Sequence, residues 1–155
     1  MPLPTTRIRP FRHGDGDAFR DLNLAWIRQH WIPEAGDWAS LGHPEEKILS
    51  PGGAIFMAEV EGEAKGCCAL IHHGGGRFEL AKMAVDPSAQ GLGLGVALGE
   101  AIIAEARARG GTVLFLESNT VLTPAMGLYA RLGFQEVPIT HAAYDRCNIM
   151  MERPL

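Results

Sequence analysis

The sequence predicts an α/β fold (α+β) built on a mixed sheet, and three observations lead to this prediction. Three short β-type runs follow one another between Ala54 and Val85, joined by turns as in an antiparallel meander. From Leu94 the apolar residues recur every four positions, which is typical of an amphipathic helix. The apolar run that follows, at residues 112–117, is then expected to be a buried strand parallel to the one before the helix, because a helix crossover joins parallel neighbours.

The N-terminal part is predicted to begin with a strand and a helix. A mixed run at residues 5–11 forms the strand, and Asp15 is placed to cap the helix that follows. Pro33 ends this helix, because proline lacks the N–H that a helix interior needs. Residues 32–50 are expected to be rich in turns, with a short helical segment at residues 45–49.

The rest of the chain is predicted to continue with strands and two helices. The helix from Leu94 ends near Gly110, and a second one starts at Thr123 and Pro124, with a capping hydroxyl and a proline at the first position. Gly133 follows where a left-handed C-terminal residue is needed. The predicted strands of this part are at residues 54–60, 65–72, 78–85, 112–117, 134–137 and 145–152.

Composition narrows the class of protein. The 155 residues are 46% hydrophobic and 21% charged, so one globular domain, residues 1–155, is expected. No apolar run reaches the ~20 residues that span a bilayer, and the start lacks the apolar core of a signal peptide, so we expect a cytoplasmic protein without membrane association. The three cysteines lack zinc-site spacing, and a net charge of -4 without a basic cluster argues against nucleic acid as a partner.

A glycine-rich turn lies between strand and helix at residues 85–100, VDPSAQGLGLGVALGE. It lacks the third glycine of the dinucleotide fingerprint and the lysine that ends a P-loop. What remains is Gln90, followed by Gly93 and Gly95 at the first turn of a helix, where bare N–H groups and the helix dipole suit a pyrophosphate. Alternatively, the glycines only shape the connection and let the helix pack closely on the sheet, at Gly95 and Gly99.

Two motifs in this order resemble a known family. Residues 90–95 (QGLGLG) resemble the acetyl-CoA-binding motif Gln-x-x-Gly-x-Gly of the GNAT superfamily of N-acetyltransferases. Residues 128–134 (LYARLGF) resemble its second signature, Leu-Tyr-x-x-x-Gly-Phe. The strand at residues 79–83 (ELAKM) is similar to that of members in which it reads Glu-Leu-x-Lys-Met. The resemblance covers residues 55–134.

The resemblance implies a GNAT fold, with a mostly antiparallel sheet of six to seven strands, a V-shaped splay between two parallel strands and about four flanking helices. It implies direct transfer of the acetyl group of acetyl-CoA to the primary amine of a small molecule, without a metal. The pantetheine arm would lie in the splay and the pyrophosphate at the glycine turn. The cofactor-binding residues that it implies are Met83, Ala84, Val85, Gln90, Gly91, Leu92, Gly93, Leu94, Gly95, Asn119 and Tyr129.

The resemblance also implies three catalytic residues. Tyr129 matches the tyrosine that acts as general acid toward the CoA sulfur, and the backbone N–H of Met83 would stabilise the oxyanion. Glu79 is expected as general base, because it precedes Gln90 by the offset that the histone-modifying branch uses. Strand alternation would put Glu79, Met83 and Val85 on one face. A water chain ending at another carboxylate serves the base role equally well.

Asn119 has two interpretations. Many members carry an asparagine seven residues before the tyrosine, where this chain has Leu122. Asn119, three residues earlier, either replaces that contact with the cofactor arm or caps the loop. The adjacent His72 and His73 are not expected to bind a metal, because neighbouring side chains of a strand point to opposite faces.

The sequence alone does not decide how the acceptor is bound or whether the acceptor is a small molecule. Trp26, Trp31 and Trp38, with Glu34 and Asp37, lie in the segment that commonly walls the acceptor site of GNAT folds, where they either receive a cationic amine or serve as core. The alternatives to a small-molecule enzyme are a non-catalytic sensor of CoA or acetyl-CoA and an acetyltransferase of protein lysines or N-termini. Many relatives form homodimers, and the sequence carries no interface signature.

Overall fold

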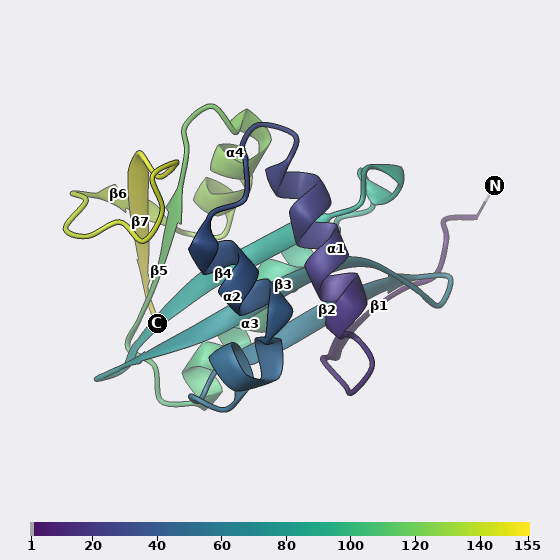
Figure 1. Ribbon diagram of the computed structural model, residues 1–155, viewed down its shortest axis with the longest axis horizontal. Coiled ribbons are helices and arrows are strands. Elements are labelled where there is room, and N and C mark those ends of the chain that lie inside the picture. Colours follow the sequence, from purple (N-terminus) through teal and green to yellow (C-terminus); the bar gives the residue numbers. More distant parts are fainter. Residues whose placement is uncertain (1) are drawn as a thin grey trace.

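A seven-stranded sheet runs through the middle of the computed structural model, which describes residues 2–155 (Figure 1). The strands are β1 (Thr6–Pro10), β2 (Ala54–Val60), β3 (Glu63–Gly74), β4 (Arg77–Val85), β5 (Val113–Ser118), β6 (Gln135–Val137) and β7 (Ile149–Pro154). Their order across the sheet is β1-β2-β3-β4-β5-β7-β6. β4 and β5 run parallel, whereas the other neighbouring pairs are antiparallel. The predicted mixed, mostly antiparallel sheet is confirmed.

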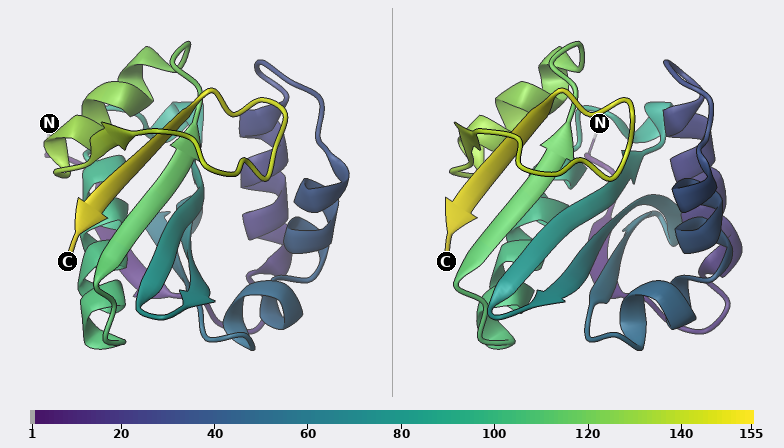
Figure 2. Two further views of the ribbon diagram at one scale, coloured as in Figure 1. Left: turned by 90° about the vertical axis from the view of Figure 1, so that its left-hand side faces the viewer. Right: turned by 60° about the vertical axis from the view of Figure 1, so that its left-hand side comes forward.

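Helices cover both faces of the sheet, with α1 and α2 on one side and α3 and α4 on the other (Figure 2). The helical elements are α1 (Gly16–Ile27), α2 (Ala35–Gly42), α3 (Leu94–Ala108) and α4 (Thr123–Arg131), with the short turns η1 (Glu45–Leu49) and η2 (Pro87–Ala89). Each face has its own apolar core, centred on Phe19 and Met57 under α1 and on Leu98 and Leu114 under α3. Between residues 2 and 155, none of these helices combines the length and apolar character needed to cross a membrane.

The parallel strands β4 and β5 separate part of the way along. They pair only over residues 77–79 and 113–115, although β4 continues to Val85 and β5 to Ser118. Figure 2 shows the two strands diverging. The predicted V-shaped splay is therefore present, and it leaves the facing edges of both strands without a strand partner, so that an extended ligand has backbone groups to pair with.

A β-bulge interrupts β4 at Lys82 and Met83. The register with β3 shifts there, so that two residues of β4 oppose one residue of β3, and Lys82 adopts a left-handed backbone with a φ of 55°. The bulge reverses the side-chain alternation. Leu80 packs in the core under α3, so Glu79 faces α1, whereas Met83 and Val85 beyond the bulge also pack against the core under α3. The prediction that Glu79 shares a face with Met83 and Val85 is wrong for this reason.

Of the two predicted helix caps, Asp15 is the N-cap residue of α1, as predicted, whereas Thr123 is not a cap. The carboxylate of Asp15 turns to Arg9, with oxygen-to-nitrogen distances of 2.7 and 3.0 Å, and makes no cap bond to α1. This pairing is preferred because Arg9 is itself buried and needs a partner for its charge. Thr123 is the first residue of α4 and not its cap, which is Leu122. Gly133 has the predicted left-handed backbone, with a φ of 92°.

The boundaries differ from the prediction at two loops. α2 forms inside the segment expected to be rich in turns, and a capping box between Glu34 and Asp37 starts it. β7 begins at Ile149 and not at residue 145, because the preceding residues make contacts away from the sheet, including those of Arg146 with α2. α1 ends at Ile27, well before Pro33.

Gly95 and Gly99 let α3 and α4 pack closely. A Cβ atom at Gly95 would lie 3.1 Å from Leu128, and one at Gly99 would lie 2.4 Å from Leu132. The close packing expected at these glycines is therefore against α4 and not against the sheet. It fixes the start of the helix that follows the glycine turn against the helix that carries Tyr129.

Candidate active site

A pocket beside the splay brings together residues from distant parts of the chain. Glu79 and Met83 reach it from β4, Asn119 from the loop after β5, and Tyr129 from α4, so that all three predicted catalytic residues line it. The loop between β6 and β7 extends across toward α2, as Figure 2 shows, and adds Arg146 to the lining. The predicted glycine turn lies outside this pocket, at the N-terminus of α3.

The glycine turn presents unpaired backbone donors. Gly91 and Gly93 have left-handed backbones, with φ of 82° and 76°, and a Cβ atom at either would meet no atom within 4 Å. The hydrogen bonds described within residues 2–155 leave the N–H groups of residues 91–96 without a protein acceptor. The first bond of α3 runs from the Ala97 N–H to the Gly93 carbonyl, at 3.1 Å. This cradle fits the pyrophosphate of a CoA thioester, because helix N-termini bind anions.

Tyr129 combines a buried ring with a position on the pocket wall. The ring packs edge-on against Phe134, with a centroid distance of 6.1 Å, and only 8% of the residue is exposed. Burial raises the pKa of the Tyr129 phenol above its ordinary value. The hydroxyl therefore stays protonated at neutral pH, and it can act as a hydrogen-bond donor.

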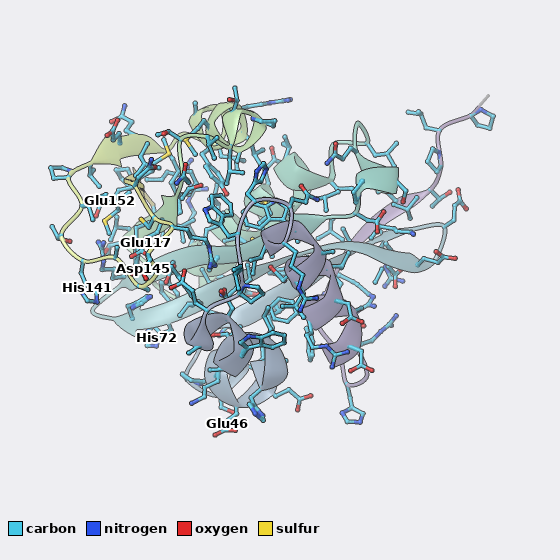
Figure 3. All side chains as sticks on the ribbon, turned by 45° about the horizontal axis from the view of Figure 1, so that its top comes forward. Glu46, His72, Glu117, His141, Asp145 and Glu152 are labelled. Atoms are coloured by element: carbon cyan, nitrogen blue, oxygen red, sulfur yellow. The ribbon has the colours of Figure 1, made fainter. Side chains whose placement is uncertain are left out.

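Two carboxylates, those of Glu79 and Glu117, line the pocket where β4 and β5 begin to separate. Glu79 is paired with His73, at 2.9 Å, and Glu117 accepts a 3.0 Å hydrogen bond from the Ala143 N–H. Burial raises the pKa of Glu117, and the negative charge of Glu79 raises it further. Figure 3 shows Glu117 on the side of the molecule where the loop with His141 lies. Sequence reasoning missed Glu117, although its place near the end of a strand that parallels β4 was a usable signal.

The sequence also did not predict the contacts of a buried polar cluster formed by Asp37, Lys82, Tyr144 and Arg146. Asp37 is fully buried and accepts 2.8 Å hydrogen bonds from both terminal nitrogens of Arg146 and a 3.0 Å bond from Lys82. Lys82 also donates to the Tyr144 hydroxyl, at 2.8 Å, and both cations stack on the Tyr144 ring. Burial raises the pKa of Asp37, but the bonds from Arg146 and Lys82, with the Glu34 N–H, outweigh it and hold the pKa at about 2.

Asn119 holds the loop after β6 in place. Its side-chain nitrogen donates to the Arg146 carbonyl and its oxygen accepts from the Val121 N–H, both at 2.9 Å. Leu122 lines the pocket where many members carry an asparagine. Both ends of the Asn119 amide are thus occupied by backbone groups.

The two histidines of the β3–β4 hairpin have different hydrogen-bond partners. His72 contacts the Pro51 carbonyl at 3.0 Å, whereas His73 pairs with Glu79. Among residues 2–155, no three histidine, cysteine, aspartate or glutamate side chains come together in a way that could hold a metal ion.

Comparison with known proteins identifies the family. The model of the acetyltransferase (GNAT) family matches residues 18–134, which include the glycine turn, both carboxylates and Tyr129. A mycothiol acetyltransferase from Salinispora arenicola is 34% identical over 94% of this chain and 50% of its own length. The chain therefore spans about half the length of this relative.

Solved structures share the fold at low sequence identity. An acetyltransferase of the GNAT family from Staphylococcus aureus Mu50 has a TM-score of 0.87 and 20% identity, covering 97% of this chain and 99% of that one. The yncA protein from Salmonella typhimurium, solved with its cofactor acetyl-CoA, has a TM-score of 0.76 and 20% identity over 96% and 93% of the two chains. With the family match, the splayed sheet and the glycine turn, these findings show that the chain belongs to the GNAT family of acetyltransferases.

Proposed function

We propose that this protein is an N-acetyltransferase that transfers the acetyl group of acetyl-CoA directly to the primary amine of a small-molecule acceptor. The observation that carries the proposal is the row of unpaired N–H groups at residues 91–96, close to a splay whose adjoining pocket holds Tyr129 and a carboxylate pair. Bound acetyl-CoA supplies the acetyl group as a thioester. The protein must bind it, take a proton from the amine and return one to the sulfur.

Each of these tasks has a candidate group. The glycine turn holds the pyrophosphate, and the free edge of β4 at Ala84 and Val85 pairs with the pantetheine arm. The Met83 N–H stabilises negative charge on the thioester oxygen. Glu117 receives the proton of the amine, and the negative charge of Glu79 raises the pKa of Glu117; this departs from the expectation of Glu79 as base and corresponds to the alternative, another carboxylate. Tyr129 donates to the departing sulfur.

The first experiment is isothermal titration with acetyl-CoA, followed by a thiol-release assay over a panel of amino acids, polyamines and aminoglycosides. Micromolar binding with release that one amine class stimulates supports the enzyme. Binding without release for any amine favours a sensor of acetyl-CoA, and release only with peptides favours a protein acetyltransferase. Absence of binding overturns the assignment of the glycine turn.

Replacing Tyr129 with phenylalanine is expected to lower kcat by about 10-fold to 100-fold, because the departing thiolate loses its proton donor. The affinity for acetyl-CoA should stay within about twofold, since the ring still packs against Phe134. Steady-state kinetics and titration of the Tyr129→Phe variant check this. Full turnover in the variant would exclude Tyr129 as the acid.

Replacing Glu117 with glutamine is expected to lower kcat/KM by about 100-fold and to remove the acidic limb of its pH profile. The deprotonated carboxylate is the active form, so activity rises with pH through the pKa of Glu117, which burial raises from its ordinary value. Glu79→Gln is the matched control. It removes the neighbouring negative charge, which should move the limb to lower pH. A Glu117→Gln variant that keeps the wild-type limb would contradict the role of Glu117.

A further inference from the structure

The pocket has a cationic wall that the chemistry proposed above does not use. Lys82 and Arg146 both line the pocket, and their side chains are only 6% and 14% exposed. Asp37, which is not a lining residue, holds both of them from behind. Glu34 adds one further contact to Arg146, at 3.2 Å. Fixed cations of this kind are preorganised to receive an anion, because their side chains are already ordered.

Several hydrogen-bond donors on this wall remain free. Lys82 donates to Asp37 and to the Tyr144 oxygen, which leaves one of its three N–H bonds. The Tyr144 hydroxyl accepts from Lys82 and keeps its own proton for donation. The Nε of Arg146 has no acceptor in the described part of the chain, yet it is not among the buried unpaired atoms there, so it is accessible.

The pocket also has a negatively charged wall, which β4 and β5 form. Glu79 and Glu117 both line the pocket, and each uses one oxygen, toward His73 and the Ala143 N–H. The other oxygen of each carboxylate is left for a ligand. The charged residues of the lining are thus two carboxylates on the strands and two cations, Lys82 at the bulge and Arg146 on the loop.

We infer that the acceptor is an amino carboxylate, a small molecule that carries a primary amine and a carboxylate a few bonds apart, as a free amino acid does. Its ammonium lies against Glu79 and Glu117, where the proton is removed, and its carboxylate binds the free donors of Lys82, Tyr144 and Arg146. The inference rests on the proposed function and specifies its substrate class. A diamine or polyamine fits less well, because it brings a second positive charge to the cationic wall and leaves these donors unpaired.

Titration of small molecules into the protein in the presence of CoA tests this inference. CoA carries no acetyl group, so no transfer occurs and the reactivity of the amine plays no part. The probes are the common L-amino acids, β-alanine and γ-aminobutyrate, each titrated beside its own carboxamide, which keeps the shape and loses the charge. We expect at least one acid to bind about 10-fold to 100-fold more tightly than its amide, as charge-assisted bonds require.

Two variants assign this preference to the cationic wall. Arg146→Gln should bring the ratio of acid to amide affinity close to one, and Tyr144→Phe, which keeps every charge, should lower it about threefold to tenfold. The affinity for acetyl-CoA should be unchanged in both, since neither residue lies at the glycine turn. Tyr144→Phe keeps the test decisive if Arg146→Gln fails to fold.

The outcomes separate this inference from the proposed function. The inference is overturned if every amide binds as tightly as its acid, or if the preference for the acid persists in both variants. Selective binding of an acid without any thiol release supports the cationic wall and removes the transferase. Thiol release that is equal for acids and amides keeps the transferase and removes the amino carboxylate.

Discussion

Replacing Gly93 with valine is expected to weaken acetyl-CoA binding by about 100-fold or more, while the fold survives. No protein atom lies within 4 Å of a Cβ at this position, so the branched side chain fits the fold but occupies the space in front of the free N–H groups of α3. Each charge-assisted bond to the pyrophosphate is worth about 1.5–3 kcal/mol, so losing two of them accounts for the effect. Isothermal titration measures it.

Gly110→Val is the matched control for backbone strain. Gly110 follows the other end of α3, has a similar φ of 79° and also has no atom within 4 Å of an added Cβ. Both variants should lose about 1–3 kcal/mol of stability, because valine is strained in the left-handed region. Only Gly93→Val should lose acetyl-CoA. Equal affinity in the two variants would show that the turn does not hold the cofactor.

Replacing Asp37 with asparagine is expected to lower the free energy of unfolding by about 3–5 kcal/mol. The change keeps the size of the side chain but leaves Lys82 and Arg146 buried side by side without their shared carboxylate, and uncompensated buried charge is costly. Denaturant unfolding measures the loss. Glu34→Gln is the control, because Glu34 is 31% exposed, and glutamine keeps an oxygen that can accept the bonds from Arg146 at 3.2 Å, from the Asp145 N–H at 3.3 Å and within the capping box, so it should cost less than about 1 kcal/mol.

The pKa of Asp37 gives this effect a pH dependence. The folded pKa of about 2 lies below the ordinary value of 3.8, so the stabilisation is fully present above about pH 4 and is lost as the pH falls toward 2. The difference in stability between the wild type and Asp37→Asn should therefore shrink over that interval. A constant difference would mean that the charge of Asp37 is not what stabilises the cluster.

The regular elements could be predicted because their local signals agree with the fold. The strand at Ala54–Val60 was predicted to the residue, and α3 starts at Leu94 as predicted, since turns and apolar periods mark both. α2 was missed because its eight residues, AGDWASLG, include two glycines and few strong helix formers. Its formation depends on the capping box and on packing that a local pattern does not carry.

The glycine turn and Tyr129 were more predictable than the buried cluster around Asp37. The glycine turn and Tyr129 belong to short contiguous motifs, so spacing alone could select them. Asp37 meets Lys82 and Arg146 across 45 and 109 positions of sequence, and no local pattern records such a contact. The bulge at Lys82 could not be predicted for a different reason. A left-handed backbone is expected at glycine and not at lysine, so the residue type gave no sign of it.

The two glycine contacts between α3 and α4 have a consequence for how the molecule can move. Because Gly95 and Gly99 lie directly against Leu128 and Leu132, the glycine turn and Tyr129 are held relative to each other by close packing. The cationic wall is held differently, since Arg146 comes from a loop that side-chain bonds tie to α2. The distance between the glycine turn and Tyr129 is therefore set within one packed pair of helices and does not depend on the loop that carries Arg146.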